Sequence, residues 1–120
     1  MFRWLSISLI ILVFSCGKPL PELENMDLTS WKNDKDGCSG KRESMEAAIT
    51  QQKDKLLALD EAAVIRLLGK PDKNELYTRN QKFYTYYITP SPECGSEFST
   101  SVKLIIRFNA MGLAKEITIE

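Results

Sequence analysis

Residues 59–72, LDEAAVIRLLGKPD, and residues 81–89, QKFYTYYIT, decide the fold of this chain because the spacing of apolar residues changes between them. In the first stretch apolar residues recur every three or four positions, as they do on one face of a helix. Asp60 precedes them as an N-cap, and Gly69 and Pro71 end the helix. In the second stretch β-branched and aromatic residues take over with a period of two, which predicts a strand.

The same two periods continue outward from these stretches. Upstream, residues 39–58 have the three-and-four spacing of an amphipathic helix. Downstream, residues 102–108 and 113–120 alternate and predict two more strands, and a weaker strand is expected at residues 75–78. We therefore predict an α+β fold in which two N-terminal helices pack on a three- to four-stranded antiparallel sheet, as a two-layer αα-βββ domain.

The start of the chain is typical of a bacterial lipoprotein precursor. Arg3 provides a positive charge, and an apolar run follows over residues 4–14. This run is shorter than the roughly 20 residues that span a bilayer, so it predicts a cleaved signal peptide. Residues 13–16, VFSC, resemble a lipobox and predict lipid attachment at Cys16.

We therefore expect a signal peptide at residues 1–15, a lipidated N-terminus and flexible tether at residues 16–30, and one domain at residues 31–120. Trp31, at this boundary, either packs on the core or is exposed to a partner. The residues that follow Cys16 include no early aspartate, which resembles lipoproteins sorted to the outer membrane. The expected location is the periplasmic face of the outer membrane, where the lipid anchor makes the membrane itself a partner.

Cysteine usage agrees with export. The chain has three cysteines, and lipid on Cys16 leaves Cys38 and Cys94 as a pair. Disulfides persist in the oxidising compartments outside the cytoplasm, so we predict a Cys38–Cys94 disulfide if the fold brings the two Cα atoms within roughly 7 Å. A metal-binding or reactive thiol is the alternative, but no other cysteine and no histidine lies at ligand spacing.

Composition and motifs argue against several functional classes. The chain has 16 basic and 16 acidic residues, interspersed along its length, so we expect no nucleic-acid partner. It has no histidine, which removes the commonest general base and metal ligand. Residues 33–37, NDKDG, with Glu43 match part of a calcium loop, but Lys32 stands where the first carboxylate is required. We expect no metal, no cofactor and no catalytic residues.

Three motifs are spaced as in a known lipoprotein family. They are the helix end LLGKP at residues 67–71, the aromatic strand FYTYY at 83–87 and the strand and turn LIIRFNAMG at 104–112. Together they resemble the BamE (SmpA/OmlA) lipoproteins, whose fold is shared with β-lactamase inhibitor proteins. The resemblance implies a scaffold in outer-membrane protein assembly or envelope integrity, with the barrel-assembly complex as its partner. The alternative is an inhibitor or recognition module that presents residues 91–99 to an exported enzyme.

The expected partner surface is the sheet face away from the helices. We predict that Tyr84, Tyr86 and Ile105 lie there, beside Lys103 and Arg107. Exposed aromatic residues are typical of protein-binding surfaces. The alternative is that the long cationic side chains only cover the rings.

Overall fold

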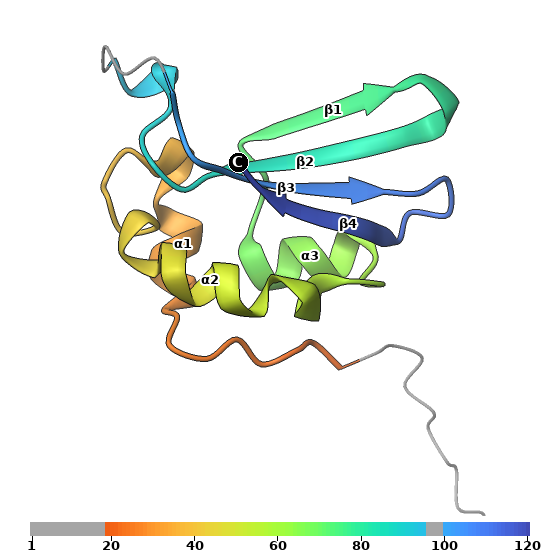
Figure 1. The fold of residues 1–120 in the computed structure, drawn as a ribbon, viewed down its shortest axis with the longest axis horizontal. Coiled ribbons are helices and arrows are strands. Elements are labelled where there is room, and N and C mark those ends of the chain that lie inside the picture. Colours follow the sequence, from red (N-terminus) through yellow and green to blue (C-terminus); the bar gives the residue numbers. More distant parts are fainter. Residues whose placement is uncertain (1–18, 96–99) are drawn as a thin grey trace, which may run out of the picture.

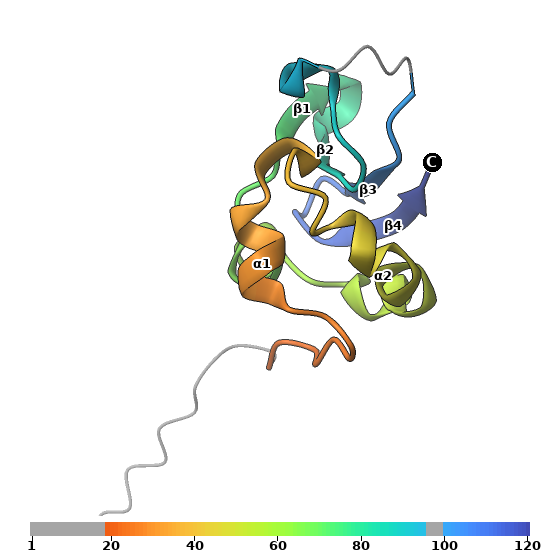
Figure 2. The same ribbon diagram turned by 90° about the vertical axis from the view of Figure 1, so that its left-hand side faces the viewer.

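A computed structural model of the 120-residue chain describes residues 19–95 and 100–120. In this part of the chain three α-helices and a four-stranded antiparallel sheet are present, which confirms the α+β class. Their bounds are α1 Leu28–Asn33, α2 Glu46–Gln52, α3 Glu61–Leu68, β1 Lys73–Tyr77, β2 Gln81–Tyr87, β3 Lys103–Phe108 and β4 Ala114–Ile119. The 3₁₀ turns are Lys35–Gly37, Glu43–Met45, Lys53–Leu56, Thr78–Asn80 and Pro92–Cys94. Both ribbon views place the three helices on one side of the sheet (Figures 1 and 2).

Helix α3 begins and ends as its sequence predicts. The Asp60 carboxylate accepts a hydrogen bond from the Ala63 backbone N–H at 2.7 Å, which satisfies a donor of the first turn. Gly69 follows the last helical residue with a φ of 82°, a conformation that costs glycine little. The apolar face, formed by Ala63, Val64, Leu67 and Leu68, is buried under the sheet.

The helix predicted over residues 39–58 is much shorter in the structure. Gly40 has a φ of 77°, so the chain is not helical there, and α2 begins only at Glu46. The tight turns on either side, Glu43–Met45 and Lys53–Leu56, continue the same buried face. The apolar period therefore identified the correct face but not the length of the helix.

The folded part of the chain also begins before residue 31, where the sequence placed the domain boundary. Leu23 is 7% exposed and belongs to the core. Helix α1 starts with a cap, because the Asp27 carboxylate accepts hydrogen bonds from the Thr29 and Ser30 backbone N–H groups. Trp31 is completely buried, which confirms that it packs on the core.

The sheet is a meander in the order β1-β2-β3-β4. Each strand pairs with the next in antiparallel fashion. In the central pair, Tyr84 lies opposite Ile106 and Tyr86 lies opposite Leu104. Side chains at paired positions share a face, so these four residues face the same layer.

Candidate interaction site: the open face of the sheet

The prediction of the partner surface was wrong for two of its three residues, Tyr84 and Tyr86. Tyr84 and Tyr86 are 3% and 0% exposed and point into the core, so they do not lie on the face away from the helices. Ile105 does lie on that face, because it pairs with Thr85, and neighbours along a strand point to opposite sides. The two buried tyrosines therefore hold the sheet to the helices and leave the opposite face to other residues.

Both buried tyrosine hydroxyls are hydrogen-bonded to the α3 region. The Tyr84 hydroxyl donates to the Glu61 carboxylate at 2.8 Å, and the Tyr86 hydroxyl donates to the Gly69 carbonyl at 2.7 Å. Glu61 also forms an ion pair with Lys82 at 2.9 Å. Desolvation, followed by the hydrogen bond to Glu61, raises the pKa of Tyr84 to about 12. Desolvation is also the main cause that raises the pKa of Tyr86.

This environment predicts alkaline destabilisation. The native state keeps the Tyr84 proton above pH 10, where an unfolded tyrosine loses it, so the free energy of unfolding falls as pH rises from about 10 to 12. The Tyr84→Phe variant has no such proton. In this variant we expect the free energy of unfolding to fall less steeply between pH 10 and 12. At pH 7 we expect it to be about 1 kcal/mol lower, because the hydrogen bond is missing. Urea unfolding at each pH measures both changes. The same pH dependence of the free energy of unfolding in the two proteins would contradict the role given to the Tyr84 proton.

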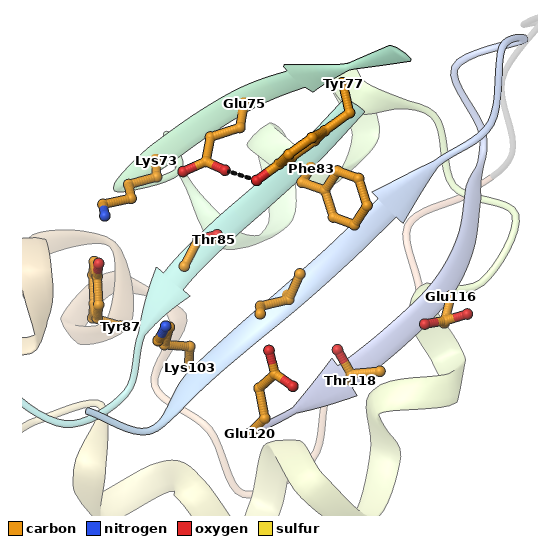
Figure 3. Close-up of a pocket in the computed structure, with 11 residues that line it drawn as sticks. Lys73, Glu75, Tyr77, Phe83, Thr85, Tyr87, Lys103, Glu116, Thr118 and Glu120 are labelled. Atoms are coloured by element: carbon orange, nitrogen blue, oxygen red, sulfur yellow. Dashed lines mark hydrogen bonds between the residues drawn. The ribbon is translucent and has the colours of Figure 1, made fainter. Parts of the chain in front are cut away.

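The residues that do line the uncovered side form a shallow hollow of about 420 Å³, which we call the open face (Figure 3). Its side chains come from all four strands and their ends. They are Lys73, Glu75, Tyr77, Phe83, Thr85, Tyr87, Lys103, Ile105, Glu116, Thr118 and Glu120. The open face therefore spans the sheet from one edge strand to the other.

An aromatic pair stands at one side of the open face. The Tyr77 and Phe83 rings meet edge to face, with their centres 4.8 Å apart, and the Tyr77 hydroxyl donates to the Glu75 carboxylate (Figure 3). That hydrogen bond raises the pKa of Tyr77. Tyr77 is still 52% exposed, and Leu76 on the other side of the same strand is 68% exposed. The β1 edge thus presents apolar area to solvent on both of its sides.

Charges of both signs surround these apolar groups. Lys73 places its Nζ atom 5.7 Å from the centre of the Tyr87 ring, and Lys103 lies near Tyr87 (Figure 3). Glu116 and Glu120, from β4 and the residue after it, contribute carboxylates, and the Glu120 backbone is hydrogen-bonded to that of Lys103. Cations, carboxylates and aromatic rings in one shallow hollow form a polar rim around apolar contacts, as in protein-binding surfaces.

Behind the sheet, a buried ion pair joins the segment between α1 and α2 to the residue before β1. The Arg42 and Asp72 side chains are each 1% exposed, and Arg42 Nη1 lies 2.5 Å from Asp72 Oδ2. Arg42 also donates to the backbone carbonyls of Trp31 and Tyr87. Its guanidinium carbon lies 5.2 Å from the centre of the Trp31 ring. Arg42 therefore joins the helical layer to the residue before β1 and to the last residue of β2.

The predicted disulfide is present. Cys38 and Cys94 are bridged, with their Cα atoms 5.5 Å apart and a sequence separation of 56. The bridge joins the chain after α1 to the 3₁₀ turn Pro92–Cys94, where the Ser91 N–H also donates to the Asp36 carbonyl. It therefore ties the loop before β3 to the helical layer. Cys16 and the signal peptide at residues 1–15 lie outside the described residues, as do residues 96–99 of the loop.

Two kinds of site were searched for in the described residues: metal-binding clusters and membrane-spanning helices. Within residues 19–95 and 100–120, no group of three or more His, Cys, Asp or Glu side chains could hold a metal ion. No helix in this part of the chain is long and apolar enough to cross a membrane. A scan against protein-family models, a search of the curated proteins and a search of the solved structures found no match to this chain. Its function must therefore be argued from the surface itself.

Proposed function

We propose that this chain is a lipid-anchored envelope protein that binds another protein through the open face of its sheet and catalyses no reaction. The observation that carries the proposal is the open face itself. It is wide and shallow, has no helix over it in the described part of the chain, and places the Tyr77–Phe83 pair and Ile105 within a charged rim. Apolar and aromatic groups within a charged rim are typical of surfaces that bind partner proteins.

The anchor is proposed from the sequence of the first residues. A positively charged start, an apolar run of signal-peptide length and a cysteine after Ser15 favour lipidation at Cys16. The Cys38–Cys94 disulfide is consistent with an oxidising compartment such as the periplasm. We infer that the lipid holds the domain at the periplasmic face of the outer membrane.

Removal of the anchor is the first test. In the Cys16→Ser variant the lipid has no attachment site, so we expect the chain to leave the membrane fraction or to remain as an uncleaved precursor. Fractionation of envelopes with intact-mass analysis distinguishes these forms. A Thr50→Ser variant is the control, because it introduces serine at an exposed position of α2 and affects neither the anchor nor the disulfide. Unchanged mass and fractionation of the Cys16→Ser variant would overturn the lipoprotein proposal.

We also propose that the domain has the fold of the BamE-like lipoproteins. The order of three helices followed by a four-stranded meander is compatible with the αα-βββ unit of BamE-like lipoproteins. We infer from this that the partner belongs to the machinery of outer-membrane protein assembly or envelope integrity. The motifs LLGKP and FYTYY support the inference, since they form the end of α3 and the core of β2.

A charge on the open face tests the binding surface. In the Ile105→Glu variant a carboxylate replaces an apolar contact at the centre of the hollow, and we expect partner recovery in affinity purification to fall at least tenfold. The matched control is Ile65→Glu, because Ile65 is 39% exposed on α3 in the helical layer. We expect this control to recover the partner normally. Equal recovery from both variants, with both folded, would contradict the proposed surface.

The identity of the recovered protein separates the two functional classes. Barrel-assembly components would support the scaffold function. Recovery of an exported enzyme whose activity falls as purified domain is added would instead support the inhibitor or recognition module. In that case crosslinks are expected from the loop at residues 91–95 and not from the open face.

A further inference from the structure

A second hollow lies on another part of the surface, between the end of α1 and the linker from α3 to β1. Its volume is about 350 Å³. It is lined by Lys32, Lys35, Arg42, Lys70, Pro71 and Asp72. We call it the lysine pocket. Three separate segments of the chain therefore bring cations to one place, although no basic cluster is visible in the sequence.

The charges that line the lysine pocket do not cancel. Its one carboxylate, Asp72, is already occupied by Arg42 and by the backbone N–H groups of Asp36 and Tyr87. Asp36 does not line the pocket, but its carboxylate is close enough to feel the charges of Lys35 and Arg42. Even with Asp36 included, the four cations Lys32, Lys35, Arg42 and Lys70 exceed the two carboxylates. The pocket therefore has a positive excess that its own groups leave unneutralised.

Of the three lysines that line the pocket, Lys32 has a hydrogen-bond partner within the protein. Lys32 Nζ donates to the Arg66 carbonyl at 2.8 Å, near the end of α3. Among the described residues no ion pair is formed by Lys35 or Lys70, and both side chains are exposed. Two ammonium groups at the rim are thus available to a ligand.

Arg42 gives the pocket a rigid inner wall. It is 1% exposed, and its hydrogen bonds use Nε and Nη1. Nη2 has no acceptor among residues 19–95 and 100–120. A buried guanidinium that already holds a carboxylate is fixed in place, so a ligand gains from its charge without having to order it.

We propose that the lysine pocket binds a phosphate or phosphate-ester group. A planar carboxylate is best recognised by two parallel N–H donors of an arginine. In this pocket the Nε and Nη1 donors of Arg42 already bind Asp72 and two backbone carbonyls. Lysine ammonium groups act as point charges and suit the divergent oxygens of a phosphate. Lys35 and Lys70 approach from different segments, which matches oxygens that point in different directions.

The phosphate has two chemical sources. It is either part of a soluble phosphate ester or the headgroup of a lipid in the membrane to which the chain is anchored. The pocket is larger than a bare phosphate ion, which leaves room for the group that carries it. Both sources require the same two lysines, so one pair of variants tests the site for each.

The test measures binding to the full chain in neutral detergent, with inorganic phosphate as the probe and backbone amide NMR shifts as the readout. We expect saturable shifts at Lys35 and Lys70 that weaken as salt is added. The double variant Lys35→Gln/Lys70→Gln should bind at least about tenfold more weakly, because it loses two charged hydrogen-bond donors. The double variant Arg79→Gln/Lys115→Gln removes the same charge from exposed positions outside both hollows and should change affinity less than about twofold.

A second arm identifies the source. The full chain is placed in phosphatidylcholine vesicles with or without phosphatidic acid. If a lipid headgroup is the ligand, phosphatidic acid displaces inorganic phosphate, and the Lys35→Gln/Lys70→Gln variant abolishes the effect. If the source is soluble, phosphate binds equally in both vesicles. The proposal is overturned by non-saturable shifts, or by an equal loss of affinity in the two double variants when both remain folded.

Discussion

Replacing Arg42 by methionine should lower the free energy of unfolding by about 3–5 kcal/mol, the range found when one partner of a buried ion pair is removed. The variant leaves Asp72 charged in a site where it is 1% exposed. It also removes the donors to the Trp31 and Tyr87 carbonyls, which then remain buried without this partner. Methionine keeps most of the side-chain volume, so the loss measures charge and hydrogen bonding more than a cavity.

The matched control is Arg107→Met on the sheet surface. Arg107 forms an ion pair with Glu116 at 3.4 Å, but the two side chains are 27% and 57% exposed. Exposed pairs contribute from about 0 to 1 kcal/mol, so this variant should be close to the original protein. Urea unfolding at pH 7 compares the two. A loss below about 1 kcal/mol for Arg42→Met would contradict the role given to the buried pair.

Loss of the disulfide should have a similarly large effect. The double variant Cys38→Ser/Cys94→Ser opens a loop of 56 residues, and the chain-entropy model gives a destabilisation of about 4 kcal/mol. The bridge restricts the unfolded chain more than it stabilises any one contact, so the native sheet should be unchanged in its circular dichroism. We expect a lower urea midpoint for the variant.

Reduction provides an independent control for this prediction. Dithiothreitol should lower the unfolding midpoint of the original chain to near that of the double variant and should leave the variant unaffected. If the reductant shifted the variant as much as the original, its effect would not come from the Cys38–Cys94 bridge. A destabilisation below about 1 kcal/mol in the variant would contradict the expected contribution.

Local sequence signals predicted the elements whose stability is local. Asp60 and Gly69 define α3 because a cap and a positive-φ glycine act on their own helix. The alternation in residues 81–89 and 102–108 located β2 and β3 to within two residues. The cysteine count predicted the disulfide, because assigning Cys16 to the predicted lipid leaves two cysteines and a single pairing.

The local sequence did not predict which face of β2 meets the helices, because that depends on pairing with β3. Alternation shows that Tyr84 and Thr85 face opposite sides, but it does not say which side meets the helices. The register with β3 decides it, since Tyr84 lies opposite the buried Ile106. Phe83 and Thr118 therefore replace the two tyrosines on the proposed surface.

The buried ion pair and the lysine pocket were missed for a related reason. Arg42 and Asp72 are 30 residues apart and lie in segments with no charge pattern. The same segment explains the overlong helix prediction, because Asp34 accepts hydrogen bonds from the Ser39 and Arg42 backbone N–H groups and holds this stretch in a turn. Tertiary hydrogen bonds thus override the helical period over residues 39–42.

Site-specific photocrosslinking in intact envelopes tests the central claim most directly. A benzophenone side chain is placed at Thr118, on the open face, and at Ala62, which is exposed on α3 in the helical layer. We predict that Thr118 gives one strong adduct with an envelope protein and that Ala62 gives none. The Ile105→Glu substitution should abolish the Thr118 adduct. A strong adduct from Ala62 with none from Thr118 would contradict binding through the open face.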